Sequence, residues 1–145
     1  MKPEFVEYVR FRIEQANETL RDAKSLYETG TLHGVINRLY YACFYGVLAL
    51  LFTEGASSKK HTGILSLLDR DWVKTGRLSP DSGRFLRRLF DLRLQADYGY
   101  PLRLERDDVA KWLRDGEHFL NEVLARVDEW LSSAQQNEAG ELHNE

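Results

Sequence analysis

The chain has 145 residues, of which 43% are hydrophobic and 30% are charged, and its 20 basic and 23 acidic residues give a net charge of −3. This composition excludes a disordered chain and a general binder of polyanions, and it predicts one domain with a sizeable core. The single cysteine, Cys43, excludes an internal disulfide, and the N-terminal segment lacks the apolar run of a signal peptide. The longest mostly apolar stretch, Leu39 to Phe52, is shorter than the roughly 20 residues that cross a bilayer, so we expect a cytoplasmic protein without a membrane anchor.

The first two predicted elements are long helices, because apolar residues recur at spacings of three and four. The first starts with Pro3 in its first turn and stops at Gly30. The second spans about residues 31–55, with Thr31 as a cap, and is apolar on nearly every face. It is therefore expected to be the central, most buried helix, with Cys43 as a small core residue.

Three further helices are predicted after a polar joint, TEGASSKKH. A shorter helix covers about residues 64–76, and its docking is the least determined feature of the pattern. The fourth helix opens at residue 79 with the sequence SPD, a cap, a first-turn proline and an acid, and it ends at the segment DYGYP. The fifth begins near residue 107.

These elements predict an all-α protein, an antiparallel bundle of four long helices and one short helix. The bundle is expected to form a single domain over residues 1–131. The segment 132–145 has no apolar period and is expected to be a disordered tail.

Familiar enzyme signatures are absent from the sequence, including the GxSxG, Walker, HExxH and CxxC motifs. The four histidines, at positions 33, 61, 118 and 143, do not pair with carboxylates at metal-binding spacing. We therefore predict neither a metal site nor a cofactor.

Two polar residues interrupt the most hydrophobic helix. Asn37 and Arg38 open the stretch NRLYYACFY, and Arg38, Tyr41 and Tyr45 follow one stripe at spacings of three and four. A guanidinium on an otherwise apolar helix needs a partner, so this stripe is a candidate site.

A second polar pair lies on the fourth predicted helix, in the stretch FDLRLQADYGYP. Arg93 comes four residues after Leu89 and three before Ala96, which places it on or beside the inward face, and Asp97 follows at i+4. Because breaking a buried ion pair costs several kcal/mol, Asp97 is the nearest candidate partner for Arg93.

These polar residues have two interpretations. In the first, Asn37, Arg38, Arg93, Asp97 and tyrosine hydroxyls form a structural network that fixes the register of the helices. In the second, a groove between the second and fourth helices binds phosphate, because Arg makes bidentate contacts with phosphate and Tyr offers a stacking face.

The distribution of charge mildly favours phosphate binding. Residues 70–106 contain nine basic and five acidic residues, whereas the rest of the chain has an excess of acid. Arg84, Arg87 and Arg88 form one helical face in this stretch, and taken alone they are explained slightly better by a solvated face neutralised by Asp81 and Asp91 than by phosphate binding.

The stretches NRLYYACFYGVLALL, KKHTGIL and RLQADY, in this order and with these separations, resemble the HEPN superfamily of small helical domains. More closely, they resemble an uncharacterised bacterial and archaeal branch whose second helix reads Asn-Arg-x-Tyr-Tyr-Ala and whose fourth ends in Arg-x-x-x-Asp-Tyr. The resemblance covers roughly residues 10–130. It implies a helical bundle, commonly a homodimer, that is often paired with a minimal nucleotidyltransferase in toxin–antitoxin modules.

The resemblance also implies a metal-independent ribonuclease site in catalytic members, formed across the dimer by an Arg and a His separated by four to six residues. Arg93 matches that arginine, but Tyr98 stands in place of the histidine, and Tyr is a poor acid or base near neutral pH. Tyr100 matches a tyrosine that receives adenylate from the partner nucleotidyltransferase in some modules. Lys60 and His61 match a lysine and a histidine of this branch. Their loop position is compatible with the mouth of the groove and equally with a helix cap and a surface lysine.

Three hypotheses about function follow. The first is a non-catalytic or weakly catalytic module that binds RNA or a nucleotide beside a nucleotidyltransferase. In the second, the chain is a ribonuclease toxin in which Tyr98 or His61 replaces the missing histidine. The third is a protein-interaction module whose polar network is purely structural.

The first hypothesis assigns a role to each candidate residue. Arg93 and Arg38 contact phosphate, Asp97 orients Arg93, and Tyr98 or Tyr100 stacks on a base or ribose. The candidate binding residues are Asn37, Arg38, Tyr41, Lys60, His61, Arg93 and Tyr98, and the candidates for catalysis are Arg93, Asp97 and Tyr98. Exposed aromatic residues such as Phe5, Tyr8 and Trp130 would suit a helix-to-helix face of a homodimer.

Overall fold

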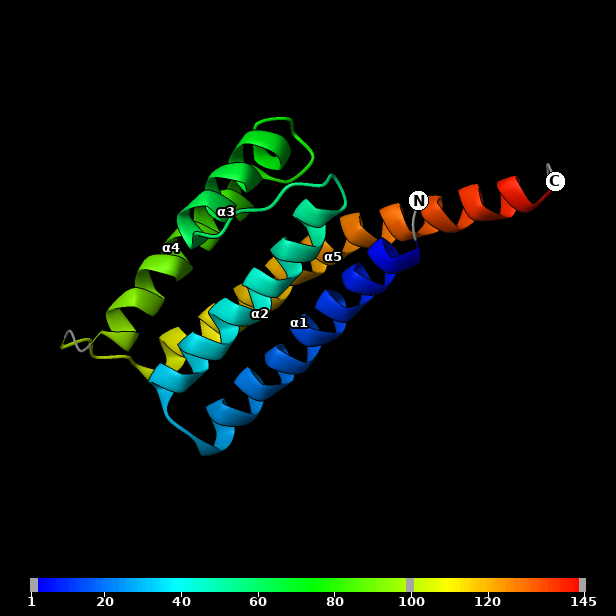
Figure 1. The fold of residues 1–145 in the computed structure, drawn as a ribbon. Coiled ribbons are helices and arrows are strands. Elements are labelled where there is room, and N and C mark those ends of the chain that lie inside the picture. The colour runs from blue at the N-terminus through cyan, green and yellow to red at the C-terminus, as the bar shows by residue number, and fades with distance from the viewer. Residues whose placement is uncertain (1–2, 99–100, 144–145) are drawn as a thin grey trace.

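The computed structural model describes residues 3–98 and 101–143, and no strand occurs among them. The elements in chain order are α1 (Pro3–Thr29), α2 (Leu32–Phe52), α3 (His61–Leu68), the π-helical turn η1 (Asp69–Val73), α4 (Pro80–Asp97) and α5 (Arg106–His143). Figure 1 shows α1 and α2 as an antiparallel hairpin, with α5 behind α2. Helices α3 and α4 lie on the side of α2 that faces away from α1. The all-α bundle predicted from the sequence is confirmed.

Side-chain caps fix the starts of the helices that position the site. The hydroxyl of Thr31 accepts a hydrogen bond from the Gly34 N–H at 3.1 Å and begins α2. The hydroxyl of Ser79 accepts one from the Ser82 N–H at 3.3 Å, and Pro80 follows in the first turn of α4. Each cap satisfies a backbone donor that has no partner inside its helix, so the capping signals in the sequence give the correct starts.

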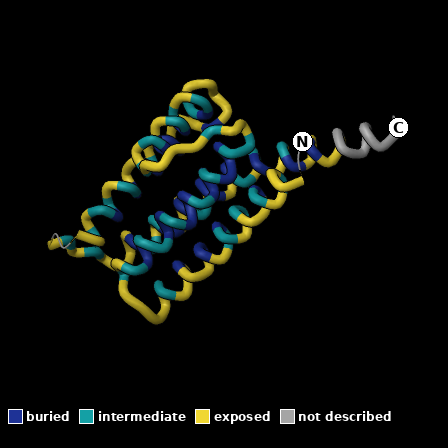
Figure 2. The backbone as a smooth tube through the Cα atoms, in the orientation of Figure 1, coloured by how far each residue is buried: buried dark blue, intermediate teal, exposed yellow. Residues whose placement is uncertain are grey.

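Helix α2 forms the centre of the core (Figure 2). Its buried side chains contact α1 on one side and α5 on another, and Gly46 and Gly116 allow the close approach to α5. A Cβ atom at Gly46 would lie 2.5 Å from Leu120 Cδ1, which shows that these helices meet without room for a side chain there. Cys43 is fully buried, and burial raises the pKa of its thiol well above the usual range, so it is a core residue as predicted.

The same helix is long and apolar enough to cross a membrane by length and composition. Leu32–Phe52 has 21 residues and a mean hydropathy of 1.5 in its most apolar window, so it is longer than the apolar stretch expected from the sequence. However, 67% of that window is buried inside the bundle. Neighbouring helices thus cover most of the apolar surface of α2.

Helix α5 continues beyond residue 131, the predicted end of the folded domain, and reaches His143. Ala134 is 2% exposed, so contacts with the bundle extend past that boundary. The segment that follows is rich in Ala, Gln and Glu, which favour helix even without an apolar period. In Figure 1 this last part of α5 projects beyond the end of the bundle at which α1 begins.

Candidate functional site

A cluster of polar and aromatic side chains lies where α2, the start of α3 and the second half of α4 come together. We call it the arginine–aromatic cluster. Arg93 is at its centre, and each other member contacts Arg93 directly or through one neighbour. The members are Asn37, Arg38, Tyr40, Tyr41, Phe44, His61, Phe90, Arg93 and Asp97.

Arg93 is a buried arginine that is surrounded mainly by rings. It is 7% exposed, and its guanidinium carbon lies 4.7 Å from the ring centre of Tyr40 and 5.5 Å from those of Tyr41 and Phe90. These distances suit cation–π contacts, which strengthen when the cation is removed from water. Arg93 therefore lies on the inward face of α4, as the helical spacing predicted.

The polar contacts of Arg93 are few and long. Its Nη1 lies 3.5 Å from Asp97 Oδ2 and 3.5 Å from the Tyr41 hydroxyl, while its buried Nε has no hydrogen-bond partner. Asp97 is therefore the partner expected from the i+4 spacing, but it satisfies only one edge of the guanidinium. A buried donor without a partner costs free energy, so the guanidinium of Arg93 is incompletely satisfied by the cluster itself.

Asn37 links Asp97 to Arg38. The Asn37 amide donates to both carboxylate oxygens of Asp97, at 3.1 and 3.2 Å, and its carbonyl accepts from Nε and Nη2 of Arg38 at 3.1 and 2.8 Å. The Arg38 guanidinium also lies 5.3 Å from the Tyr41 ring centre. This chain of contacts orients Asp97 and holds Arg38 against Tyr41, a ring that Arg93 also contacts, without supplying Arg38 with a carboxylate.

His61, the first residue of α3, completes the cluster. Its Nδ1 lies 2.9 Å from the hydroxyl of the buried Tyr40, and its ring stacks on Phe44 at 4.3 Å. Burial, and secondly the positive charge of Arg93, lower the pKa of His61 below 6.5, so the neutral imidazole is favoured at neutral pH. Burial also raises the pKa of Tyr40 above its usual range, so the phenol stays protonated.

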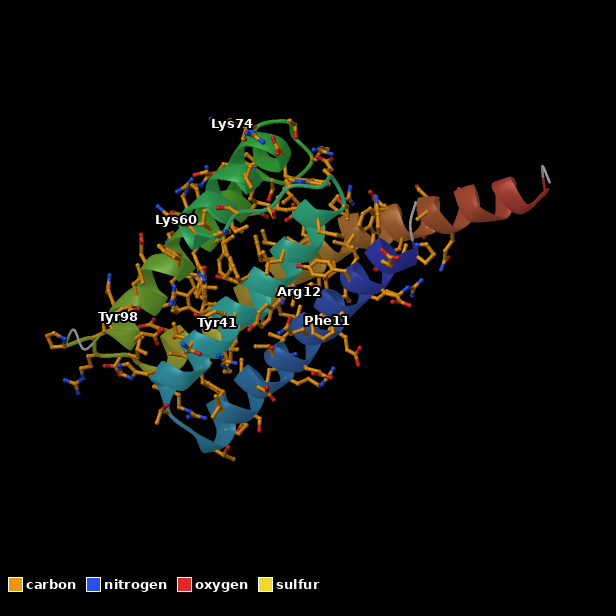
Figure 3. The ribbon with its side chains drawn as sticks, viewed as in Figure 1. Phe11, Arg12, Tyr41, Lys60, Lys74 and Tyr98 are labelled. Atoms are coloured by element: carbon orange, nitrogen blue, oxygen red, sulfur yellow. The ribbon has the colours of Figure 1, made fainter. Side chains whose placement is uncertain are left out.

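Two of the predicted site residues lie apart from the cluster. Lys60 is the exposed residue before α3 and makes no side-chain cap, and Tyr98 is 70% exposed at the end of α4 (Figure 3). Tyr100, the candidate for adenylylation, lies outside the described residues. The structure therefore unites Asn37, Arg38, Tyr41, His61, Arg93 and Asp97, and it leaves Lys60 and Tyr98 at the periphery.

Sequence reasoning missed three aromatic members, Tyr40, Phe44 and Phe90. In the sequence, Tyr40 resembles an ordinary core residue because it lies on the most apolar helix. In the structure it is fully buried. A buried tyrosine hydroxyl nevertheless needs a hydrogen-bond partner, and this requirement was a usable signal for a polar group nearby.

The basic stretch identified in the sequence is largely neutralised at the surface. Arg84 bonds to Asp81 and Arg87 bonds to Asp69, while Arg88 lies 5.5 Å from the Trp112 ring centre. A cavity of about 620 Å³ beside Arg84 and Arg88, between α4 and α5, is lined by acids and bases in similar numbers. The arginine–aromatic cluster is the better candidate for phosphate binding because its guanidinium groups are incompletely paired.

The cluster offers three kinds of chemistry with its own side chains. Arg38 and Arg93 can bind an anion, the tyrosine and phenylalanine rings can stack on a base, and His61 can accept a proton at neutral pH. Within residues 3–98 and 101–143, no group of three or more His, Cys, Asp or Glu side chains is arranged to hold a metal ion.

Comparisons with known proteins agree with this architecture. The model of the HEPN domain matches residues 9–134. A UPF0332 protein of Thermotoga maritima is 40% identical over 128 residues, covering 88% of this chain and 95% of that protein. A protein of Methanocaldococcus jannaschii named "Putative toxin MJ0142" is 30% identical over 111 residues, covering 77% of this chain and 76% of that protein. The crystal structure of TT1696 from Thermus thermophilus superimposes with a TM-score of 0.68 at 19% identity, covering 81% of this chain and 97% of that one, and thus shares the fold.

Proposed function

The chain belongs to the HEPN domain family, and from this premise we propose that it is an RNA- or nucleotide-binding module that works in a toxin–antitoxin setting. The observation that carries the proposal is the buried guanidinium of Arg93, which among the described residues has one carboxylate contact, at 3.5 Å, and no partner for its Nε. A phosphate beside the guanidinium would offset the charge that Asp97 leaves partly unpaired.

Arg38 and the rings extend the same proposed site. Arg38 is held by the Asn37 carbonyl and has no carboxylate within 4 Å among the described residues, so it supplies a second cation for phosphate. The half-buried Tyr41 ring contacts both arginines, with its ring centre 5.3 Å from the guanidinium carbon of Arg38 and 5.5 Å from that of Arg93. A base or ribose on Tyr41 would place its phosphate between the two guanidinium groups.

The test is equilibrium binding of a labelled oligouridine and of ATP to the wild type and to two variants. Arg93→Lys retains the charge but loses the planar fork, and Arg38→Ala leaves the buried core intact. We expect each to weaken binding about tenfold. Arg84→Ala is the matched control, because Arg84 is an arginine already bonded to Asp81, and it should bind like the wild type. No binding by the wild type, or equal binding by all four proteins, would refute the proposal.

A second candidate function is metal-independent cleavage of RNA, and the contact between His61 and Tyr40 favours it. The neutral His61 would take the proton of a ribose 2′-hydroxyl, whose oxygen would then attack the phosphorus. The bond to the 5′-oxygen would break, the leaving oxygen would take a proton from water, and a 2′,3′-cyclic phosphate would remain, while the His61 imidazolium would return its proton to the solvent. Arg93 would stabilise the charge on the phosphoryl oxygens. Of the two replacements for the missing histidine, His61 is favoured over Tyr98, because Tyr98 is 70% exposed and His61 contacts the cluster.

Cleavage is tested by incubating a labelled RNA with the protein in EDTA and analysing the ends of the products. We expect cyclic phosphate ends with the wild type and with Tyr98→Phe, and at least a hundredfold slower cleavage with His61→Ala, the scale of a general base. An inert wild-type protein that still binds RNA would leave the binding module as the function and would exclude cleavage under these conditions.

The family resemblance adds a homodimer and a partner nucleotidyltransferase to this proposal. The mass of the protein in solution tests the dimer. Co-purification with a small nucleotidyltransferase encoded beside it tests the partner, and incubation of the two with labelled ATP tests transfer of adenylate to Tyr100. A monomer, or a neighbour that neither binds nor labels the chain, would contradict these parts of the proposal.

A further inference from the structure

A second set of arginines and rings continues from the cluster along α2 onto α1. The Tyr41 and Tyr45 ring centres are 6.0 Å apart, and the Arg12 guanidinium lies 5.7 Å from Tyr45 and 5.2 Å from Tyr8. The Tyr8 ring then lies 4.2 Å from Phe52. We call the run Arg38, Tyr41, Tyr45, Arg12 and Tyr8 the α1–α2 strip.

Tyr41 joins the strip to the arginine–aromatic cluster. Its hydroxyl is 3.5 Å from Arg93 Nη1, and its ring is in contact with both Arg38 and Tyr45. Figure 3 labels Tyr41 on α2 and Phe11 and Arg12 on the neighbouring α1. A ligand that leaves the cluster over Tyr41 therefore meets Tyr45 and then Arg12.

The guanidinium groups of the strip lack carboxylate partners. Arg12 donates to the Tyr8 hydroxyl at 3.1 Å and to Oε1 of the Gln15 side chain at 2.7 Å. In the described parts of the chain, no carboxylate lies within 4 Å of Arg12 or Arg38. By contrast, Arg70, Arg77, Arg84 and Arg87 each bond to an acid. The strip is thus a line of rings and incompletely neutralised cations.

We propose that the α1–α2 strip binds single-stranded RNA that extends out of the cluster, an inference that rests on the proposed function. Alternating cations and stacking faces are what a flexible polynucleotide requires, because phosphates and bases alternate along it. Residues 38 to 45 alone span about 10 Å of α2 at 1.5 Å per residue, and Arg12 and Tyr8 lengthen the track across α1. The strip thus gives the site a preference for oligonucleotides over mononucleotides.

Charge argues for RNA against a second copy of this chain. A twofold interface centred on the strip would place the same patch of each copy against the other. Arg12 and Arg38 would then face identical cations, and neither has a carboxylate within 4 Å among the described residues. A polyanion satisfies these groups, whereas a second copy repels them.

The test measures affinity for oligouridines from the dinucleotide to the dodecamer. In the wild type, affinity should rise with length as nucleotides reach Tyr45 and Arg12. Tyr45→Leu and Arg12→Ala should leave dinucleotide binding unchanged and should lower the affinity for the dodecamer at least fivefold. Arg12→Ala should also reduce the salt slope for the dodecamer by about 0.7, the value for one lost phosphate contact. Arg93→Lys should weaken binding at every length.

Two controls separate stacking and local charge from damage to the fold. Tyr45→Phe retains the ring and should bind the dodecamer like the wild type. Arg10→Ala removes the same charge from an exposed position of α1 two residues away, about 200° around the helix, and should also bind normally.

The outcomes distinguish failure of this inference from failure of the proposed function. If the cluster still binds dinucleotides, equal affinity for all lengths would overturn the proposal that the α1–α2 strip binds RNA. Unchanged dodecamer binding in both strip variants would overturn it as well. No RNA binding at any length would overturn both proposals. A change in the mass of the particle in solution caused by the strip variants, with RNA affinity unchanged, would show that the strip is a protein interface instead.

Discussion

The molecule contains two arginine-rich regions that differ in what surrounds the guanidinium groups. Around η1 and the start of α4, Arg70, Arg77, Arg84 and Arg87 each bond to a nearby acid. On the face formed by α1, α2 and the second half of α4, Arg12, Arg38 and Arg93 lie against aromatic rings. Only Arg93 in this second region has a carboxylate within 4 Å among the described residues, and that contact is 3.5 Å long.

This difference shows that a count of charges along the chain does not tell which arginines are paired with an acid. The excess of basic residues between positions 70 and 106 is mostly neutralised by acids, some of which, such as Glu54 and Asp69, lie outside that interval. The available cations come from three separate helices and are separated by tens of residues. The availability of an arginine therefore depends on its tertiary partners rather than on local composition.

The largest effect is expected from removing the carboxylate that Arg93 contacts. Asp97→Ala should lower the free energy of unfolding by about 2 kcal/mol, because a buried guanidinium loses the one carboxylate that contacts it in the described part of the chain. The loss should fall below the 3–5 kcal/mol typical of fully buried pairs, since 28% of the Asp97 side chain is exposed. Urea unfolding followed by circular dichroism measures the change.

Asp81→Ala, in the paired region, is the control for this comparison. The side chains of Asp81 and Arg84 are 88% and 67% exposed, so losing this pair should cost well under 1 kcal/mol. Adding Arg93→Met to Asp97→Ala should recover much of the lost stability, because no buried charge then remains. If Asp97→Ala and Asp81→Ala cost the same, the two regions do not differ as the contacts indicate.

A smaller effect is expected from Arg77, which bonds to Glu54 and also lies 3.8 Å from the Trp72 ring centre. Arg77→Ala should destabilise the protein by about 1 kcal/mol, because a partly exposed ion pair and a cation–π contact are both lost. Part of this difference should disappear in 1 M salt, which screens the pair with Glu54. Urea denaturation of the wild type and Arg77→Ala at two salt concentrations measures this difference in stability. Arg77→Ala should bind oligouridine like the wild type.

Much of the fold could be predicted from the sequence because its signals are local. Apolar spacing and the caps at Thr31 and Ser79 determine where α2 and α4 lie, and the i+4 spacing brings Asp97 to Arg93. The resemblance to the HEPN family, carried by three ordered motifs, agrees with the domain match over residues 9–134.

The rest of the site depends on contacts between helices, which sequence periodicity does not give. His61 reaches Tyr40 only because α3 packs back onto α2 after an irregular joint, and no local signal sets that register. Arg12 meets Tyr45 only through the alignment of the α1–α2 hairpin. Tyr98 lies in the expected position along the chain and is exposed at the end of α4, an exposure that its place in the motif does not give.

The smallest predicted effect is electrostatic and links His61 to Arg93. Burial lowers the pKa of His61 first, and the charge of Arg93 lowers it further. Arg93→Met should therefore raise the pKa of His61 while leaving it below 6.5, because the imidazole stays partly buried. Binding of oligouridine to the wild type should raise it as well, since phosphate offsets the guanidinium charge. NMR titration of the histidine ring protons measures both shifts.

The same shift makes a prediction about stability, whose sign follows from proton binding. The unfolded chain takes up the His61 proton near pH 6.5, while the folded protein takes it up only at lower pH. The contribution of His61 to stability is thus fully present above pH 6.5 and decreases as the pH falls below it. His61→Gln should reduce the decline in unfolding free energy between about pH 7 and pH 5, whereas His33→Gln, at an exposed position on α2, should not. Equal declines in the two variants would show that folding does not lower the pKa of His61.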